Sequence, residues 1–161
     1  MKTDMKAYVT GLLETYPMRE KQIDLLHYEL SHPTSVSPEE MIGAMSLAHG
    51  MAGAQPAGYI SDKTRYIALN YQDKVIRTNS DVKAEIVGRL VELEQEQNRL
   101  KHYVSLLKER EAKVIRLFYF EGYTWEEVSN AENIALRTVY KVKARAIDQL
   151  AAMYEFSGTL N

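Results

Sequence analysis

The feature that most constrains the fold is a heptad pattern in the second half of the chain. From residue 86 to residue 107, six apolar residues and one glutamine recur alternately four and three residues apart. This spacing predicts one long helix of about 80–107 with a single buried seam, because every seventh residue returns to the same helix face. The other faces are mostly charged. The seam residues are Ile86, Leu90, Leu93, Gln97, Leu100, Val104 and Leu107.

A seam of this width leaves two alternatives open for the surface that covers it. Three heptads suffice for a coiled coil, so one alternative is a homodimer through about Ile86–Leu107. Gln97 would then set the register or the number of helices. The other alternative is a helix packed within the chain on the residues before it. We favour this second alternative, although the pattern alone does not separate the two.

The N-terminal residues are also predicted to be helical. Apolar side chains at helical spacing predict a helix over about 4–30. Pro17 is expected to kink or split it, because proline removes a backbone donor and clashes with the preceding turn. No segment of useful length alternates between apolar and polar residues as a half-buried strand would. The sequence therefore predicts an all-α fold with a long amphipathic helix.

Three features organise the residues that follow. Ser37, with Glu40 three residues later, predicts a capping box at the start of a helix. Residues 50–58 are small, uncharged and rich in glycine, which is typical of a linker. A further helix is expected from residue 61 or 62 to about 76. We expect the whole region 1–107 to contact a partner or a second copy.

Composition excludes several classes of function. The chain has 161 residues, a net charge of −2 and no cysteine, which excludes disulfides and cysteine-based zinc sites. Because the chain is near-neutral, nucleic-acid binding would need a local basic patch. No apolar run approaches the roughly 20 residues of a membrane span. The first residues lack the apolar stretch of a signal peptide, so a cytoplasmic protein without membrane contact is expected.

Candidate catalytic and metal-binding chemistry is weak. The four histidines show no metal-ligand spacing, and no glycine-rich phosphate loop or Ser-His-Asp arrangement is visible. Glu126 and Glu127 are better explained by capping and by the dipole of the following helix than as a catalytic pair. We therefore expect neither an enzyme nor a bound cofactor or metal.

The C-terminal residues carry the local basic patch. A first helix is predicted from Lys108 to a stop at Gly122, and Thr124, with Glu127 three residues later, predicts the cap of a second. A turn near Asn133 leads to a third helix over about 136–150. Two helices joined by a short turn, the second of them basic on one face, predict a helix-turn-helix that reads the major groove.

The two faces of the third helix differ in character. One face is apolar and predicts the core of this domain, whereas the opposite face is basic and aromatic. A solvated face on a purely structural helix is the alternative explanation. The apolar face comprises Val139, Val142, Ala146 and Leu150, and the basic face Arg137, Tyr140, Lys141, Ala144 and Arg145.

Residues 108–154 resemble region 4 of bacterial sigma factors. The resemblance is carried by "ER" before the first helix, "VIRLFYFEG", "TWEEV", the turn at Ile134 and "TVYKVKARAIDQL". The whole chain resembles phage or prophage regulators of the ArpU/RinA sort, which are small sigma-like activators of late genes. This resemblance implies a trihelical DNA-binding domain over 108–161, with double-stranded DNA and RNA polymerase as partners.

The resemblance also implies which residues contact DNA. Arg137 and Lys141 are long enough to reach guanine acceptors or phosphates. Arg145 falls where sigma factors use a basic residue close to DNA-bound activators. The residues that the resemblance places at DNA are Leu136, Arg137, Thr138, Tyr140, Lys141 and Arg145.

Three further residues are expected at the edge of this surface. The backbone amides of Thr124 and Trp125 lie at a helix N-terminus, which suits a phosphate oxygen. Lys143 is expected at the margin of the core, where its ammonium reaches a phosphate at most. The sequence departs from the sigma pattern at two positions. Ala135 stands where a capping serine or threonine is usual, and Leu136 where housekeeping sigma factors have arginine.

Two other functions stay open. One is a DNA-packaging protein of the small-terminase kind, although such proteins usually carry their helix-turn-helix at the N-terminus. The other is a sigma-like adaptor that binds RNA polymerase or another protein without reading DNA.

Overall fold

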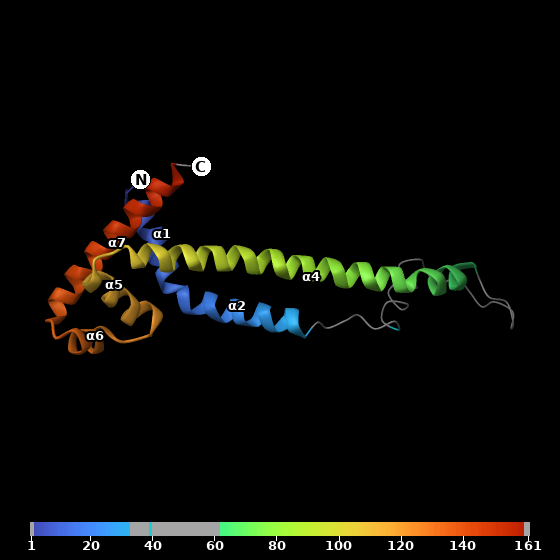
Figure 1. The fold of residues 1–161 in the computed structure, drawn as a ribbon, viewed down its shortest axis with the longest axis horizontal. Helices are drawn as coiled ribbons and strands as arrows, with labels where there is room; N and C mark the ends of the chain where they lie inside the picture. Colours follow the sequence, from blue (N-terminus) through green and yellow to red (C-terminus); the bar gives the residue numbers. More distant parts are fainter. Residues whose placement is uncertain (1, 33–38, 40–61, 160–161) are drawn as a thin grey trace. The chain divides into compact units, whose positions relative to one another are not determined.

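The protein is all-α in the part of the chain that the structure, a computed structural model, describes: residues 2–32, 39 and 62–159 (Figure 1). None of the helices described there combines the length and the apolar character that a membrane span needs. The helix predicted to start at Ser37 and the linker predicted at 50–58 lie outside the described residues. The helices are α1 (Lys2–Glu14), α2 (Tyr16–Ser31), α4 (Asp62–Ser105), α5 (Glu109–Ile115), the π-helical turn η1 (Arg116–Phe120), α6 (Trp125–Glu132) and α7 (Leu136–Gly158).

The contacts divide the chain into two compact units. Residues 1–25 and 91–161 form the first unit, and residues 26–90 form the second. In the second unit Leu90 is buried and Ile86 is half-buried on α4. All the residues that the sequence places at DNA lie in the first unit.

Pro17 splits the first predicted helix, as expected. α1 ends at Glu14 and α2 begins at Tyr16. Pro17 lies in the first turn of α2, where its missing N–H removes no helical hydrogen bond. The guanidinium of Arg19 stabilises this junction, because it donates a hydrogen bond to the carbonyl of Leu12 near the end of α1.

The long helix is continuous, which corrects one prediction. Separate helices were expected over about 62–76 and 80–107, but α4 runs unbroken from Asp62 to Ser105. Residues 77–79 include a threonine and an asparagine, which are weak helix formers, but no glycine or proline. Extending a helix is far easier than nucleating one, so a few weak helix formers do not end it.

The heptad seam of α4 is buried or half-buried along its length. Leu100, Val104 and Leu107 belong to a hydrophobic core that also contains residues of α1, α5, η1 and α7. For this end of the seam, the packing partner is therefore the same chain. The homodimer through Ile86–Leu107 stays a prediction that would require this core to open.

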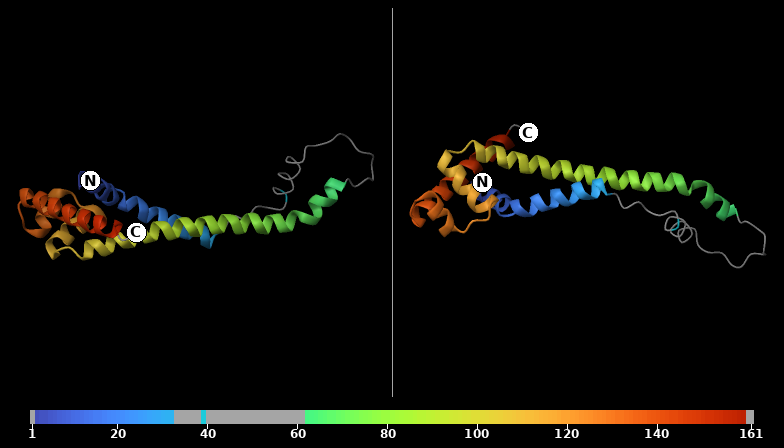
Figure 2. Two further views of the ribbon diagram at one scale, coloured as in Figure 1. Left: turned by 90° about the horizontal axis from the view of Figure 1, so that it is seen from above. Right: turned by 60° about the horizontal axis from the view of Figure 1, so that its bottom comes forward.

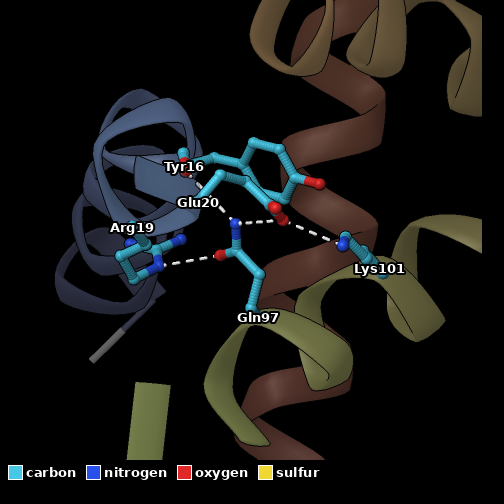
Figure 3. A network of polar contacts seen from close by, with 5 residues as sticks. All are labelled: Tyr16, Arg19, Glu20, Gln97 and Lys101. Carbon is cyan, nitrogen blue, oxygen red and sulfur yellow. Dashed lines mark hydrogen bonds and ion pairs between the residues drawn. The ribbon is translucent and has the colours of Figure 1, made fainter. Parts of the chain in front are cut away.

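A polar network joins α4 to α2 inside the first unit (Figure 3). Gln97 is 1% exposed, and its Nε2 donates to the Tyr16 carbonyl at 3.2 Å and to Glu20 at 2.8 Å. Its Oε1 accepts a hydrogen bond from Arg19 at 2.9 Å. Lys101 completes the network with an ion pair to Glu20 at 2.8 Å. Within the described residues, Gln97 thus bonds to α2 of the same chain.

The last helix is longer than predicted. The expected helix ended near residue 150, but α7 continues to Gly158. Its C-terminal half packs on α1, as both views in Figure 2 show. The ring of Tyr154 meets Tyr8 of α1 edge-on at 5.9 Å and Tyr103 of α4 at 4.8 Å between centroids. Independent folding of 108–161 stays a prediction, and the packing on α1 shows what such a fragment would lose.

Candidate DNA-binding surface

Three consecutive helical segments form the predicted helix-turn-helix. The first segment is α5 followed directly by η1. It ends at Phe120, and Gly122 just beyond has a φ of 77°, in the left-handed region that glycine adopts without strain. The predicted stop at Gly122 is therefore confirmed.

The π-helical turn η1 directs three consecutive aromatic side chains to three different partners. Phe118 stacks on Trp125 with 3.4 Å between ring centroids. Tyr119 is 5% exposed in the main core. Phe120 stacks on Tyr16 of α2 at 3.9 Å. A π turn inserts an extra residue into the helix, and here η1 ties the helix-turn-helix to α2 on one side and to α6 on the other.

The predicted capping box at the start of α6 is present. The Thr124 hydroxyl accepts a hydrogen bond from the Glu127 amide at 3.2 Å, and the Thr124 amide donates to the Glu127 carboxylate at 2.8 Å. The Thr124 amide is therefore already bonded within the chain. A phosphate at this helix start would meet the next amide, that of Trp125, or displace Glu127.

The turn between α6 and α7 follows the predicted chemistry. Asn133 ends α6 in the left-handed conformation, with a φ of 52°, which asparagine tolerates better than most residues. Ser129 donates from its hydroxyl to the Ile134 carbonyl, which holds the turn closed. Ala135 occupies the N-cap of α7 and provides no side-chain hydrogen bond, as expected from its methyl side chain.

A small core of four valines holds α6 against α7. Val114 from α5 and Val128 from α6 are fully buried in it, together with two valines of α7. This packing fixes the direction in which the first turns of α7 point. The predicted apolar face of α7 is confirmed as buried along its length: Val139, Val142, Ala146 and Leu150.

The opposite face of α7 is open to solvent. Arg137, Lys141 and Arg145 are exposed, and none of them forms an ion pair with any residue that the structure describes. Tyr140 flanks them on the side of Trp125 and is 47% exposed. Leu136 and Thr138 lie beside this face and are half-buried. The structure therefore brings the predicted contact residues of α7 onto one accessible surface.

The acid on α7 nearest to these cations is already neutralised. Asp148 follows the basic residues along the helix and pairs with Lys6 of α1 at 2.6 Å. Because Lys6 already pairs with this carboxylate, Asp148 reduces the positive potential around the exposed cations less than its place in the sequence would suggest. The first turns of α7 present an excess of positive charge, which is what a phosphate backbone attracts.

Lys143 makes a contact that the sequence did not predict. Its ammonium nitrogen lies 4.9 Å from the centroid of the Trp125 ring, as in a cation–π interaction. The same indole meets the Tyr140 ring edge-on at 5.9 Å. The predicted marginal position of Lys143 is confirmed, since its side chain is half-buried. Its partner depends on how α6 crosses α7, and no local sequence signal reports that crossing.

Trp125 and Val128 of α6 are buried to different degrees. Val128 is fully buried. The indole is half-buried, with Phe118 stacked against it. Trp125 therefore links the domain core to the accessible edge of the surface.

Metal chemistry has no support in the described ranges. Among residues 2–32, 39 and 62–159, no group of three or more histidine, aspartate or glutamate residues is placed to hold a metal ion.

Residues 104–152 match the family model described as Sigma-70, region 4. The match covers α5, η1, α6 and most of α7. The comparisons with curated proteins and with solved structures gave no match. The C-terminal part of the chain thus resembles sigma region 4, a helix-turn-helix family whose domains are DNA-binding, transcription-related and non-enzymatic.

Proposed function

We propose that this chain regulates transcription by binding a specific sequence in double-stranded DNA with the first turns of α7. The observation that carries the proposal is an exposed face on the helix that follows the turn. It holds an exposed tyrosine and three cations that form no ion pair with any of the described residues. In a helix-turn-helix, this helix enters the major groove and its N-terminal residues meet the base edges.

The side chains divide into base-reading and phosphate-binding groups. Arg137 and Lys141 reach guanine acceptors, and Thr138 and Tyr140 contact either bases or phosphates. Leu136 packs against a thymine methyl, because its apolar side chain has no hydrogen bond to offer. These five residues set the sequence preference.

Phosphate contacts come from the edges of the same surface. Arg145 lies farther along α7 and binds the backbone, while Lys143 touches a phosphate beside its indole partner. The amide of Trp125 binds a phosphate at the start of α6, and Thr124 takes part once Glu127 is displaced. Contacts of this kind position the helix without carrying sequence information.

The targets we propose are phage or prophage genes, which the chain activates. The support is the resemblance of the whole chain to ArpU/RinA-like regulators, together with the sigma region 4 match at its C-terminus. In this proposal the N-terminal helices contact RNA polymerase. A run-off transcription assay with purified polymerase tests this part, because an activator raises transcript yield from a promoter that carries its site.

The DNA-reading face is tested by substitutions on α7. A preferred site is first selected from a random duplex pool. Arg137→Ala and Lys141→Ala should each weaken binding to that site by about 1–3 kcal/mol and relax its sequence preference. Lys83→Ala is the matched control, since this exposed lysine lies on α4 in the other unit.

The outcomes of this experiment decide whether the exposed face of α7 reads DNA. Loss of preference in the two α7 variants, with unchanged melting temperatures and an unaffected control, supports base reading. Wild-type affinity in both variants would overturn the proposal. If those variants still bound RNA polymerase, the adaptor function would take its place.

A further inference from the structure

An apolar groove lies between the end of α4 and the C-terminal half of α7. Its volume is about 560 Å³. Two of its side chains stand far into solvent, since Leu106 is 58% exposed and Phe156 is 68% exposed. No lining residue is charged, although 26% of the chain is. The lining is formed chiefly by Tyr103, Leu106, Gln149, Ala152, Met153 and Phe156.

The groove extends beyond the part of the chain that matches the sigma model. That match ends at residue 152 and begins at residue 104. Tyr103, Met153 and Phe156 therefore lie outside it. The groove depends on the last turns of α7, which extend beyond the matched residues.

The α7 side of the groove is a helix-packing stripe. Gln149, Ala152, Met153 and Phe156 are spaced three, one and three residues apart, which places them on one side of the helix. At 3.6 residues per turn, this stripe is rotated by about a quarter turn from the face that carries Arg137 and Lys141. The two surfaces can therefore be occupied at the same time.

This angle suits a two-fold pair of the chain. When two antiparallel helices pack about a two-fold axis, the axis is perpendicular to both, and the same stripe serves both copies. Faces that lie a quarter turn from the contact then point along the axis, in the same direction in both copies. Packing of the Gln149–Phe156 stripes thus turns both basic faces toward one side.

The distance along α7 agrees with this arrangement. The stripe is centred near residue 153 and the basic residues near residue 139. At about 1.5 Å per residue, the middle of the basic residues lies about 20 Å along α7 from the two-fold axis. In two exactly antiparallel helices, the basic regions of the two copies are therefore about 40 Å apart. Successive half-sites for helix-turn-helix dimers lie about 34–36 Å apart, and a crossing angle between the helices shortens the 40 Å toward that value.

Charge and shape also favour a second copy as the occupant. The residues that line the groove are uncharged. When the grooves of two copies meet, no like charges are brought together and no charge is buried. In such a pair, Phe156 of one copy would lie opposite Gln149 of the other, and Met153 opposite the small side chain of Ala152. We propose that a second copy of this chain docks on the α4–α7 groove. A consequence follows that rests on the proposed function: the DNA site bound by the dimer should be two-fold symmetric.

Sedimentation of the full chain over a concentration series tests the docking. The wild type should form a dimer, and Phe156→Glu should raise its dissociation constant by about 30-fold or more, because a charge would enter an apolar contact. Phe156 is largely exposed, so this variant should keep the wild-type melting temperature. Leu25→Glu is the control, since Leu25 is 63% exposed on α2 away from the groove, and it should still dimerise.

Two sedimentation results would contradict the proposed docking. A wild type that stays monomeric overturns the proposal, and so does a dimer that both Phe156→Glu and Leu106→Glu leave intact. If a monomeric wild type binds RNA polymerase through Phe156, the groove belongs to the polymerase instead.

A DNA experiment separates this inference from the proposed function. The wild type should prefer an inverted pair of selected half-sites over a single one, with centres about 10 base pairs apart. Phe156→Glu should bind one half-site like the wild type but lose that preference. If Phe156→Glu disrupts the dimer and neither protein binds DNA, the docking is supported and the proposed function fails.

Discussion

Arg19 donates from Nε to Oε1 of Gln97 over 2.9 Å, with both side chains almost fully buried. The other guanidinium nitrogens donate to the Thr15 hydroxyl and the Leu12 carbonyl. These three acceptors are all neutral, so dipoles solvate the cation in the core. Gln97 is a necessary member of this arrangement, because few other side chains both accept from Arg19 and donate to α2.

Removing both members of this pair should cost less than the sum of the two single losses. Gln97→Leu should lower the free energy of unfolding by about 1–3 kcal/mol or more, because it leaves a buried charged donor without its acceptor. Arg19→Met should also destabilise, since Gln97 then loses a donor. The double variant should be less destabilised than the sum of the two, as replacing both polar partners by apolar groups is often nearly neutral. Urea unfolding of all four proteins measures this coupling. Additive losses would show that the two side chains act independently.

The two N-caps of the helix-turn-helix offer changes of opposite sign. Thr124→Ala removes the observed cap of α6 and should cost about 1 kcal/mol. Ala135→Ser should add a comparable amount, because α7 begins without a side-chain cap. Thermal melting of both variants checks the pair. A destabilised Ala135→Ser variant would mean that the serine hydroxyl does not reach the amides of the first turn.

Alkaline pH should unfold the protein through its buried tyrosines. Burial raises the pKa of Tyr119 from 10.0 to about 12, with a further contribution from the charge of Glu14. Burial also raises the pKa of Tyr154. The folded-state pKa values lie above the unfolded ones. The contribution of the two protonated tyrosines to the free energy of unfolding is therefore complete below about pH 10 and is lost as the pH rises through the folded-state pKa values. Each tyrosine should remove about 1.4 kcal/mol per pH unit in that window.

Tyr119→Phe isolates one contribution. In urea titrations at about pH 9, 10 and 11, the variant should lose stability less steeply than the wild type by about 1.4 kcal/mol per pH unit above pH 10. The phenolate absorbance of the folded wild type should rise later than that of free tyrosine. Equal slopes for the two proteins would exclude Tyr119 as a source of the alkaline transition.

The parts of this structure that could be predicted from the sequence are those set by neighbouring residues. The capping box at Thr124, the stop at Gly122 and the turn at Asn133 each need only a few consecutive residues. The buried faces of α4 and α7 follow from helical periodicity. These features were predicted at the correct positions because local backbone chemistry determines them.

The remaining features depend on which helices meet. The seam of α4 was predicted as buried, but an apolar stripe looks the same whether a second copy or α1 covers it. The extension of α7 to Gly158 follows from packing on α1, and the contact of Lys143 with Trp125 follows from the crossing of α6 and α7. Residue spacing carries no information about such crossings, and the DNA contacts themselves stay predictions.

The C-terminal domain should be weaker alone than within the chain. A fragment of residues 105–161 keeps the four-valine core but exposes Leu150 and Tyr154, which share a core with Leu13 of α1 in the full chain. It should melt cooperatively at a lower temperature, with faster amide exchange in α7 beyond residue 146. A featureless melt would count against a domain boundary at 108, and full-chain stability would show that the contact with α1 contributes little.

The cation–π contact of Lys143 links folding to the DNA-binding surface and has a direct optical readout, because Trp125 is the chain's one tryptophan. Lys143→Met keeps the aliphatic stem but removes the charge, so it should shift the indole emission and cost about 0.5–1 kcal/mol of stability. Arg145→Met is the matched control, which should change neither quantity. Both variants should flatten the salt dependence of DNA binding by about one unit, because each removes one phosphate contact. If Lys143→Met alters the emission and stability but not the salt dependence, Lys143 supports Trp125 and binds no phosphate.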